Sequence, residues 1–122
     1  MTAGTEYDVV VVGGGPAGCS ASTFTARGGL ETLLVDAGGS ILRRNAHLEN
    51  FPGFPAGVDA RRLLDLLAEQ ADRAGCDRLE DEIVRVEPTG DGFLLETAGS
   101  GRFRADYVVA ATRYEVGYLD RV

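Results

Sequence analysis

Residues 7–18 read YDVVVVGGGPAG, and residues 33–36 read LLVD. The four valines before the glycines are typical of a parallel strand that is covered on both faces. Pro16 suits the first turn of a helix, because its missing N–H costs little there. A second apolar stretch then ends in an acid, Asp36. This order of strand, glycine turn, helix and strand is the fingerprint of dinucleotide-binding βαβ units, so we predict a bound dinucleotide cofactor.

Each residue of the fingerprint has a task in that hypothesis. Gly13 permits the tight turn, Gly15 lets a pyrophosphate approach the backbone, and Gly18 lets the helix pack on the strand. The positive end of the helix would face the pyrophosphate. Asp36 could accept both hydrogen bonds of an adenosine ribose and would repel a 2′-phosphate, which favours FAD or NAD over NADP. A solvated turn residue is the alternative interpretation of Asp36.

Composition limits the classes of partner. The chain has 122 residues, of which 44% are hydrophobic and 25% charged, with a formal net charge of −7 and no lysine. An acidic chain argues against nucleic acid and anionic membranes as partners, since both need a basic face. No stretch has the length and apolarity of a signal peptide or a membrane span. We therefore predict a cytoplasmic protein.

Two helices and a loop follow from the residue pattern. Residues 16–27 predict a helix that is stopped by two glycines. Residues 38–58 contain glycine and proline breaks and predict a long ordered loop. Residues 59–74 carry apolar side chains at i, i+3, i+4 and i+7 and predict an amphipathic helix. Asp59 would be its N-cap and Gly75 would follow its last turn.

The rest of the chain predicts strands. Residues 82–87, 92–97 and 102–105 are separated by glycine-rich turns and read as an antiparallel meander. Residues 106–112 have the continuous apolar character of another central parallel strand. We therefore predict one domain over residues 1–122, with an α/β, three-layer FAD/NAD(P)-binding (Rossmann-like) fold. Its parallel central sheet would carry a small antiparallel β-meander.

Several segments together carry a family resemblance. They are GGGPAG at 13–18, the paired glycines 38–39, ENFPGF at 49–54, and AAT at 110–112. With them the chain resembles the N-terminal half of the FAD domain of thioredoxin reductase-like flavoproteins, in the pyridine nucleotide-disulfide oxidoreductase class. The resemblance covers nearly all residues from Tyr7 to about Leu119. It implies FAD as cofactor and hydride or electron transfer through the flavin.

The resemblance also implies a set of cofactor-binding residues. Each member is assigned to one part of FAD. The set consists of Gly13, Gly15, Pro16, Ala17 and Gly18 for the pyrophosphate, Asp36 for the adenosine ribose, Ala37, Gly38 and Gly39 under the adenosine and ribityl portions, Asn50 for the ribityl or flavin region, main-chain groups of Glu82 or Ile83 for the adenine, and Ala111 and Thr112 beside the pyrophosphate. The residue pattern offers no catalytic side chain and no metal ligands of its own.

Three residues leave alternatives open. Arg113 stands where the family usually has glycine, and it would either pair with the pyrophosphate, block the usual path of the chain, or be solvated. His47, the single histidine, is either a proton donor beside the flavin or, as we favour, a locally bonded loop residue. Cys19 begins the nucleotide helix, where the dipole could activate it, but we favour a small buried thiol.

Parts of the family's architecture do not occur in these residues. The family's NADPH-binding domain with its C-x-x-C pair has no counterpart here, nor has the return segment that completes the FAD domain. The chain alone would therefore not reduce a disulfide, and NAD or NADP would bind through the missing domain. The alternative function is a non-catalytic nucleotide-binding or interaction domain that keeps only the βαβ site for NAD, ADP or FAD. An exposed edge where the return segment would dock favours a homodimer.

Overall fold

A computed structural model describes residues 5–38 and 46–112, and its central feature is one mixed β-sheet. The sheet has six strands in the order β5-β2-β1-β8-β7-β6. Their bounds are β1 Glu6–Val12, β2 Thr32–Asp36, β5 Asp77–Glu80, β6 Ile83–Pro88, β7 Phe93–Thr97 and β8 Arg102–Ala110. β5, β2, β1 and β8 run parallel, whereas β6, β7 and β8 form the antiparallel meander. The two parts therefore share β8.

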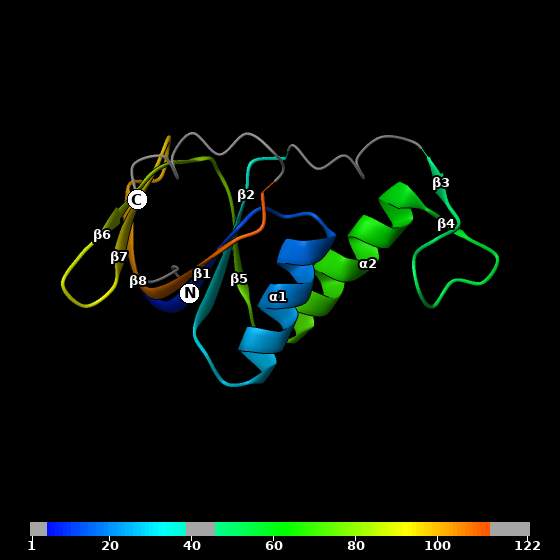
Figure 1. The fold of residues 1–122 in the computed structure, drawn as a ribbon, viewed down its shortest axis with the longest axis horizontal. Coiled ribbons are helices and arrows are strands. Elements are labelled where there is room, and N and C mark those ends of the chain that lie inside the picture. Colours follow the sequence, from blue (N-terminus) through cyan, green and yellow to red (C-terminus); the bar gives the residue numbers. More distant parts are fainter. Residues whose placement is uncertain (1–4, 39–45, 113–122) are drawn as a thin grey trace.

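The elements form three layers around the parallel strands. Helices α1 (Pro16–Arg27) and α2 (Ala60–Arg73) lie side by side on one face of these strands, and the β6–β7 hairpin lies on the opposite side (Figure 1). A small pair, β3 (His47–Leu48) with β4 (Val58–Asp59), projects beyond the start of α2. This arrangement is the predicted three-layer α/β fold. Among the described residues, no helix is both long enough and apolar enough to cross a membrane.

Strand β1 lies between two cores. Val9 and Val11 pack with Leu34 toward the helices, whereas Val10 and Val12 pack toward the meander. Side chains alternate between the faces of a strand, so a strand with a core on each side needs apolar residues at every position. All four valines are at most 5% exposed. This burial confirms the interpretation of the valine run as a central parallel strand.

The helix boundaries agree closely with the sequence pattern. Helix α1 has the predicted bounds, and α2 lies within one residue of its predicted range at each end. A carboxylate oxygen of Asp59 accepts a hydrogen bond of 3.1 Å from the N–H of Arg62, which makes Asp59 the predicted N-cap. Gly75 has φ of +99°, the left-handed conformation that favours glycine after a helix.

The sequence analysis missed strand β5. β5 has the sequence DRLE, in which polar residues predominate, so it lacks the apolar pattern that predicts a strand. It pairs in parallel with β2, from Leu33 opposite Asp77 to Asp36 opposite Glu80. β5 is an edge of the sheet, and charged side chains are common on edge strands because they discourage pairing with other chains.

Two further predictions need correction. Residues 102–105 and 106–112 were expected to form separate strands, but residues 102–110 form the single strand β8. Its residues 102–105 pair with β7 and its residues 104–110 pair with β1. Residues 38–58 were expected to be loop throughout, yet β3 and β4 pair within the described part of that range. The separation of 102–105 from 106–112 was wrong because β1 pairs with residues on both sides of that point.

A hydrogen bond across the sheet ties β1 to β5. The hydroxyl group of Tyr7 donates to a carboxylate oxygen of Asp77 at 2.9 Å, and the Tyr7 side chain is buried. We expect Tyr7→Phe to lower the free energy of unfolding by about 1 kcal/mol, because one partly buried hydrogen bond is lost. Urea titration measures this change. Tyr107→Phe is the matched control, since Tyr107 is 69% exposed, and an equal loss in both variants would contradict the assignment.

Alkaline pH gives a second measurement of the same contact. Burial, together with the hydrogen bond to Asp77 and its charge, raises the pKa of Tyr7 above its ordinary value of 10.0. The unfolded chain then loses the proton near its ordinary pKa while the folded chain keeps it, so the free energy of unfolding falls as the pH rises above 10. Tyr7→Phe removes this contribution to the pH dependence.

Candidate functional site

The carboxyl ends of the parallel strands meet at one edge of the sheet. The chain passes from β1 through α1 to β2 on one side of β1, and after the meander β8 pairs on the other side. The strand order therefore changes direction between β1 and β8. In open α/β sheets such a switch point leaves a crevice outside the strand ends, where ligands bind. The glycine turn at Gly13–Gly15 lies at this point.

The glycine turn is held in close contact with two neighbouring strand ends. Gly13 donates its N–H to the carbonyl of Val35 at 2.9 Å, and Ala111 donates to the carbonyl of Val12 at 2.8 Å. Gly13 has φ of +112°, and a Cβ there would overlap the main chain of Ala111. A Cβ at Gly18 would overlap the carbonyl oxygen of Gly13. Both positions therefore require glycine, as predicted.

The N-terminus of α1 suits an anion. Gly15 is its N-cap in an extended conformation, with no side-chain hydrogen bond, and Pro16 stands in the first turn. No acidic residue lies in that turn. The first N–H groups of a helix lack partners within the helix and carry a partial positive charge. A phosphate group matches both properties.

Asp36 lies directly over the glycine turn. Its Oδ1 accepts a hydrogen bond of 2.8 Å from the N–H of Gly38. Its carboxyl group packs against Gly14, where a Cβ would collide with it. Gly14 was absent from the predicted set, although the run of three consecutive glycines at 13–15 was a signal for it. Without a side chain at Gly14, the Asp36 carboxylate can lie beside the start of α1.

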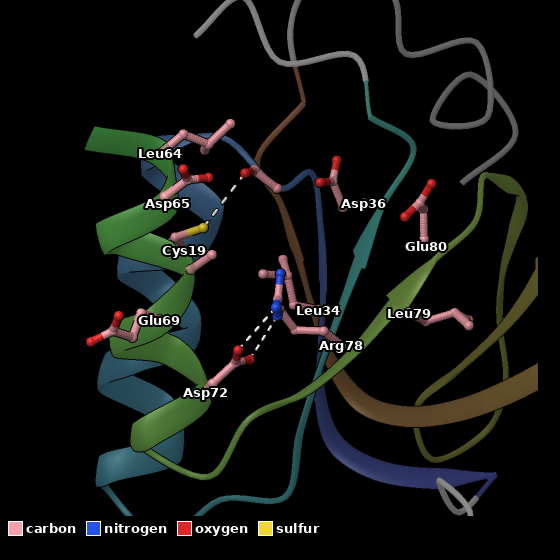
Figure 2. A pocket seen from close by; sticks show the side chains of 12 residues that line it. Cys19, Leu34, Asp36, Leu64, Asp65, Glu69, Asp72, Arg78, Leu79 and Glu80 are labelled. Carbon is pink, nitrogen blue, oxygen red and sulfur yellow. Dashed lines mark hydrogen bonds and ion pairs between the residues drawn. The ribbon is translucent and has the colours of Figure 1, made fainter. Parts of the chain in front are cut away.

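A cavity of about 510 Å³ opens beside this carboxylate. Figure 2 shows it between α2 and the strands β2 and β5, with Asp36 and Glu80 at its upper end. Its lining also includes Gly14, Cys19, Leu34, Leu64, Asp65, Ala68, Glu69, Asp72, Arg78 and Leu79. Glu80 is the register partner of Asp36 on the neighbouring strand. The cavity is therefore strongly acidic where it meets the glycine turn.

The guanidinium group of Arg78 is engaged by one acidic partner. It binds the carboxylate of Asp72 through two hydrogen bonds, Nε to Oδ1 at 2.6 Å and Nη2 to Oδ2 at 2.9 Å. These bonds tie β5 to the last turns of α2, as Figure 2 shows. The hydrogen bond to Asp72 also raises the pKa of Arg78 above its ordinary value. Arg78 thus offsets part of the negative charge of the cavity wall.

The other predicted residues fall into two places. Asp81 donates its N–H to the carbonyl of Asp36 at 3.1 Å, which brings the following Glu82 and Ile83 beside the end of β2. Ala111 lies against the glycine turn. Asn50 instead lines a separate hollow of about 290 Å³ formed by residues 49–55. The structure therefore gathers the residues predicted for the adenosine side and leaves Asn50 apart from them.

The remaining candidates have simpler surroundings. Ala37 is exposed and Thr112 half-buried, and Gly38 has φ of +82°. His47 pairs with Asp59 across β3 and β4, and its ring lies against Gly57. His47 thus lies in a short strand rather than in the predicted loop. Gly39 and Arg113 lie outside the described residues.

Both cysteines are buried thiols. Cys19 is 2% exposed, and its Sγ donates to the carbonyl of Gly14 at 3.5 Å. Cys76 is also buried, and burial raises its pKa to about 11. A raised pKa keeps a thiol protonated and unreactive at neutral pH. The interpretation of Cys19 as a small buried thiol is confirmed.

Fold and site together define an α/β protein with a dinucleotide-type binding edge. The sequence profile of the pyridine nucleotide-disulphide oxidoreductase family matches residues 7–114, and the chain belongs to that family. The match confirms the resemblance drawn from the motifs. It makes the chain an oxidoreductase domain of this class.

Known proteins extend the comparison. A thioredoxin reductase of Streptomyces clavuligerus is 36% identical over 109 residues, which cover 86% of this chain and 34% of the relative. A thioredoxin reductase of Listeria monocytogenes is 35% identical over 113 residues, which cover 89% of this chain and 34% of the relative. The structure of a thioredoxin reductase from Gloeobacter violaceus superimposes with a TM-score of 0.83 at 28% identity, covering 96% of this chain and 42% of that one. The chain thus spans about a third of the length of the curated relatives it matches.

Gly18→Ala tests the packing of the glycine turn. The added Cβ would overlap the main chain of Gly13, which cannot move without displacing β1 or α1. We expect a loss of about 1–3 kcal/mol in the free energy of unfolding, typical of overpacking. Gly90→Ala is the control, since a Cβ there would meet nothing within 4 Å. Denaturant titration of both variants measures the difference, and equal stabilities would refute the packing argument.

Proposed function

We propose that this chain is the FAD-binding domain of a thioredoxin reductase-like oxidoreductase. The observation that carries the proposal is the glycine turn at the switch point, with the uncapped start of α1 and the carboxylate of Asp36 on either side of Gly14. A pyrophosphate and a ribose are the two neighbouring groups that these features fit. The residues present therefore suit the ADP half of FAD.

Each part of the turn has a role in this proposal. The glycine turn and the first turn of α1, from Gly13 to Gly18, would hold the pyrophosphate through main-chain N–H groups. Asp36 would accept hydrogen bonds from the ribose hydroxyls, and Ala37 with Gly38 would pass under the adenosine. Ala111 and Thr112 would border the pyrophosphate from the end of β8. Glu82 or Ile83 would meet the adenine through the main chain.

The acidic upper end of the cavity supports a choice among dinucleotides. Asp36 and Glu80 lie on neighbouring strands and line the same wall. A 2′-phosphate on the ribose would bring two further negative charges toward these carboxylates. The site therefore favours FAD or NAD over NADP, and membership of a flavoprotein class favours FAD.

The chemistry would come from the cofactor. Bound FAD supplies hydride and electron transfer, while this chain binds and orients it. Cys19 and Cys76 are both buried, so neither is suited to exchange with a disulfide substrate. Reduction of a disulfide would require a thiol pair and a nicotinamide nucleotide site that these residues do not supply. A cytoplasmic location and a homodimer stay predictions.

A nucleotide-binding domain without flavin chemistry is the second candidate. The observation that favours it is the separation of Asn50, in its own hollow, from the cavity beside Asp36. In that case the βαβ site would bind ADP, NAD or FAD through the adenosine side only. The two candidates differ in whether the flavin itself is held.

Absorption spectroscopy separates the candidates. We expect the purified protein, incubated with excess FAD and desalted, to keep the visible bands of oxidised flavin. A colourless protein whose melting temperature rises with ADP would support the second candidate instead. A protein that neither keeps flavin nor gains stability with ADP would overturn both.

Asp36→Asn tests the ribose contact. The amide keeps the shape but loses the charge and one acceptor, so we expect ADP to bind about tenfold more weakly, since hydrogen bonds to charged groups contribute about 1.5–3 kcal/mol. Binding of adenosine 2′,5′-bisphosphate should fall less, because repulsion of its 2′-phosphate is relieved. Titration calorimetry measures both ligands. Asp65→Asn makes the same charge change on the α2 side of the cavity, across from Asp36, and should leave the ratio of the two affinities unchanged. An unchanged ratio in Asp36→Asn would exclude the ribose contact.

A further inference from the structure

Asp81 is a hydrogen-bonding centre beside the adenosine side of the site. It lies between β5 and β6, and its N–H donates to the carbonyl of Asp36 at 3.1 Å. Its Oδ1 accepts from the N–H of Glu82 at 2.7 Å. The N–H of Gly99 donates to Oδ1 at 3.2 Å and to Oδ2 at 3.3 Å. One residue thus joins three segments that are far apart in the sequence: the end of β2, its own β5–β6 connection and the β7–β8 turn.

The third of these segments is the β7–β8 turn, residues 98–101. Inside this turn, the N–H of Ser100 donates to Oγ1 of Thr97 at 2.8 Å. The N–H of Ala98 donates to the carbonyl of Glu82 at 2.9 Å. The turn is therefore fastened to the start of β6 twice, once through the Asp81 carboxylate and once through the Glu82 carbonyl.

These bonds distinguish Glu82 from Ile83 as a main-chain partner for a base. The N–H of Glu82 is bound by Asp81, and its carbonyl accepts from Ala98. Ile83 is opposite Thr97 in the ladder, but the N–H of Thr97 donates to the carbonyl of Gly101 at 2.8 Å instead. For a ligand group, the carbonyl of Ile83 is therefore a better acceptor than the carbonyl of Glu82, which already accepts from Ala98.

The charged form of Asp81 is the form that makes these contacts. Hydrogen bonds, first from the side chain of Ser100 and then from the N–H of Glu82, lower the pKa of Asp81 to about 2. Its carboxylate is thus ionised at neutral pH. Hydrogen bonds that an ionised acceptor makes to main-chain N–H groups are stronger than neutral ones.

We propose that Asp81 is a positioning residue that sets the Ile83 carbonyl at a fixed place relative to Asp36, so that the site distinguishes adenine from other purines. This inference rests on the proposed nucleotide function. Adenine presents a donor at its 6-amino group, whereas hypoxanthine presents a 6-oxo acceptor at the same place. A main-chain carbonyl held there favours adenine, because the oxo group would face another acceptor.

The experiment compares ADP with IDP on the full chain. Asp81→Ala removes both carboxylate oxygens that accept hydrogen bonds from Glu82 and Gly99, and Asp81→Asn keeps one acceptor oxygen but removes the charge. Asp91→Asn is the matched control, since Asp91 is also a carboxylate bound by neighbours, Thr89 and Arg104, but in the β6–β7 turn. Titration calorimetry gives both affinities, and amide hydrogen exchange of the ligand-free variants follows the N–H groups of Glu82 and Gly99.

We expect wild type and Asp91→Asn to prefer ADP. Asp81→Ala should lose this preference, because its affinity for ADP falls about tenfold while its affinity for IDP changes little. The ADP preference of Asp81→Asn should lie between those of wild type and Asp81→Ala. Faster exchange at Glu82 and Gly99 should accompany the loss. A general loss of stability would weaken both ligands equally and leave their ratio unchanged.

Three outcomes would overturn the inference in distinguishable ways. If wild type binds ADP, and the Asp81 variants exchange faster but keep the ADP to IDP ratio, Asp81 supports only the local fold. If wild type binds neither nucleotide, the proposed function fails and the base-reading role fails with it. If the Gly99 N–H exchanges equally fast in wild type and Asp81→Ala, the Asp81 carboxylate does not hold the β7–β8 turn, and the inference is refuted.

Discussion

The contact between the glycine turn and its neighbouring strand ends is the constraint on which the candidate site depends. Gly13 donates to Val35 and touches the main chain of Ala111, so the ends of β1, β2 and β8 are held together without side chains between them. The start of α1 then lies close enough to the strand ends for main-chain N–H groups to bind a ligand. Asp36 can lie over the turn only because Gly14 has no Cβ. A larger residue at any of these glycines would separate the start of α1 from the Asp36 carboxylate, the two groups that the proposed function assigns to the pyrophosphate and the ribose.

Charge is arranged in the opposite sense on either side of this turn. The helix end offers partial positive charge with no acidic residue in its first turn, whereas Asp36 and Glu80 make the adjacent wall acidic. The nearby Arg78 is engaged by Asp72 rather than directed at a ligand. A phosphate is therefore favoured at the helix end and disfavoured beside the ribose. In the proposed function, this contrast would allow a chain of net charge −7 to bind a dinucleotide and to discriminate against a 2′-phosphate.

Helix α2 connects the two hollows of the domain. Its first turns pack with Val58 and with Phe51 and Phe54 of the 49–55 segment, in a small core of their own. Further along, residues such as Asp65 and Asp72 line the cavity beside β5. The segment that carries Asn50 and the wall that carries Asp36 thus both lie against one helix. In the proposed flavoprotein, α2 would set the distance between the adenosine and flavin ends of the cofactor.

Local sequence determined the βαβ unit, both helices and the need for glycine at the turn, because these depend on periodicity, caps and backbone conformation within a few residues. Tertiary structure decided what depends on distant partners. β5 is polar and forms a strand only because β2 offers it an edge, and β8 runs unbroken because β1 pairs with its residues 104–110, on both sides of the predicted break. The contact of the Asp36 carboxyl group with Gly14 joins residues that are far apart in the chain. So do the hydrogen bonds that the Gly99 N–H donates to the Asp81 carboxylate. Such contacts leave no periodic signal, since their residues are brought together only when the layers pack.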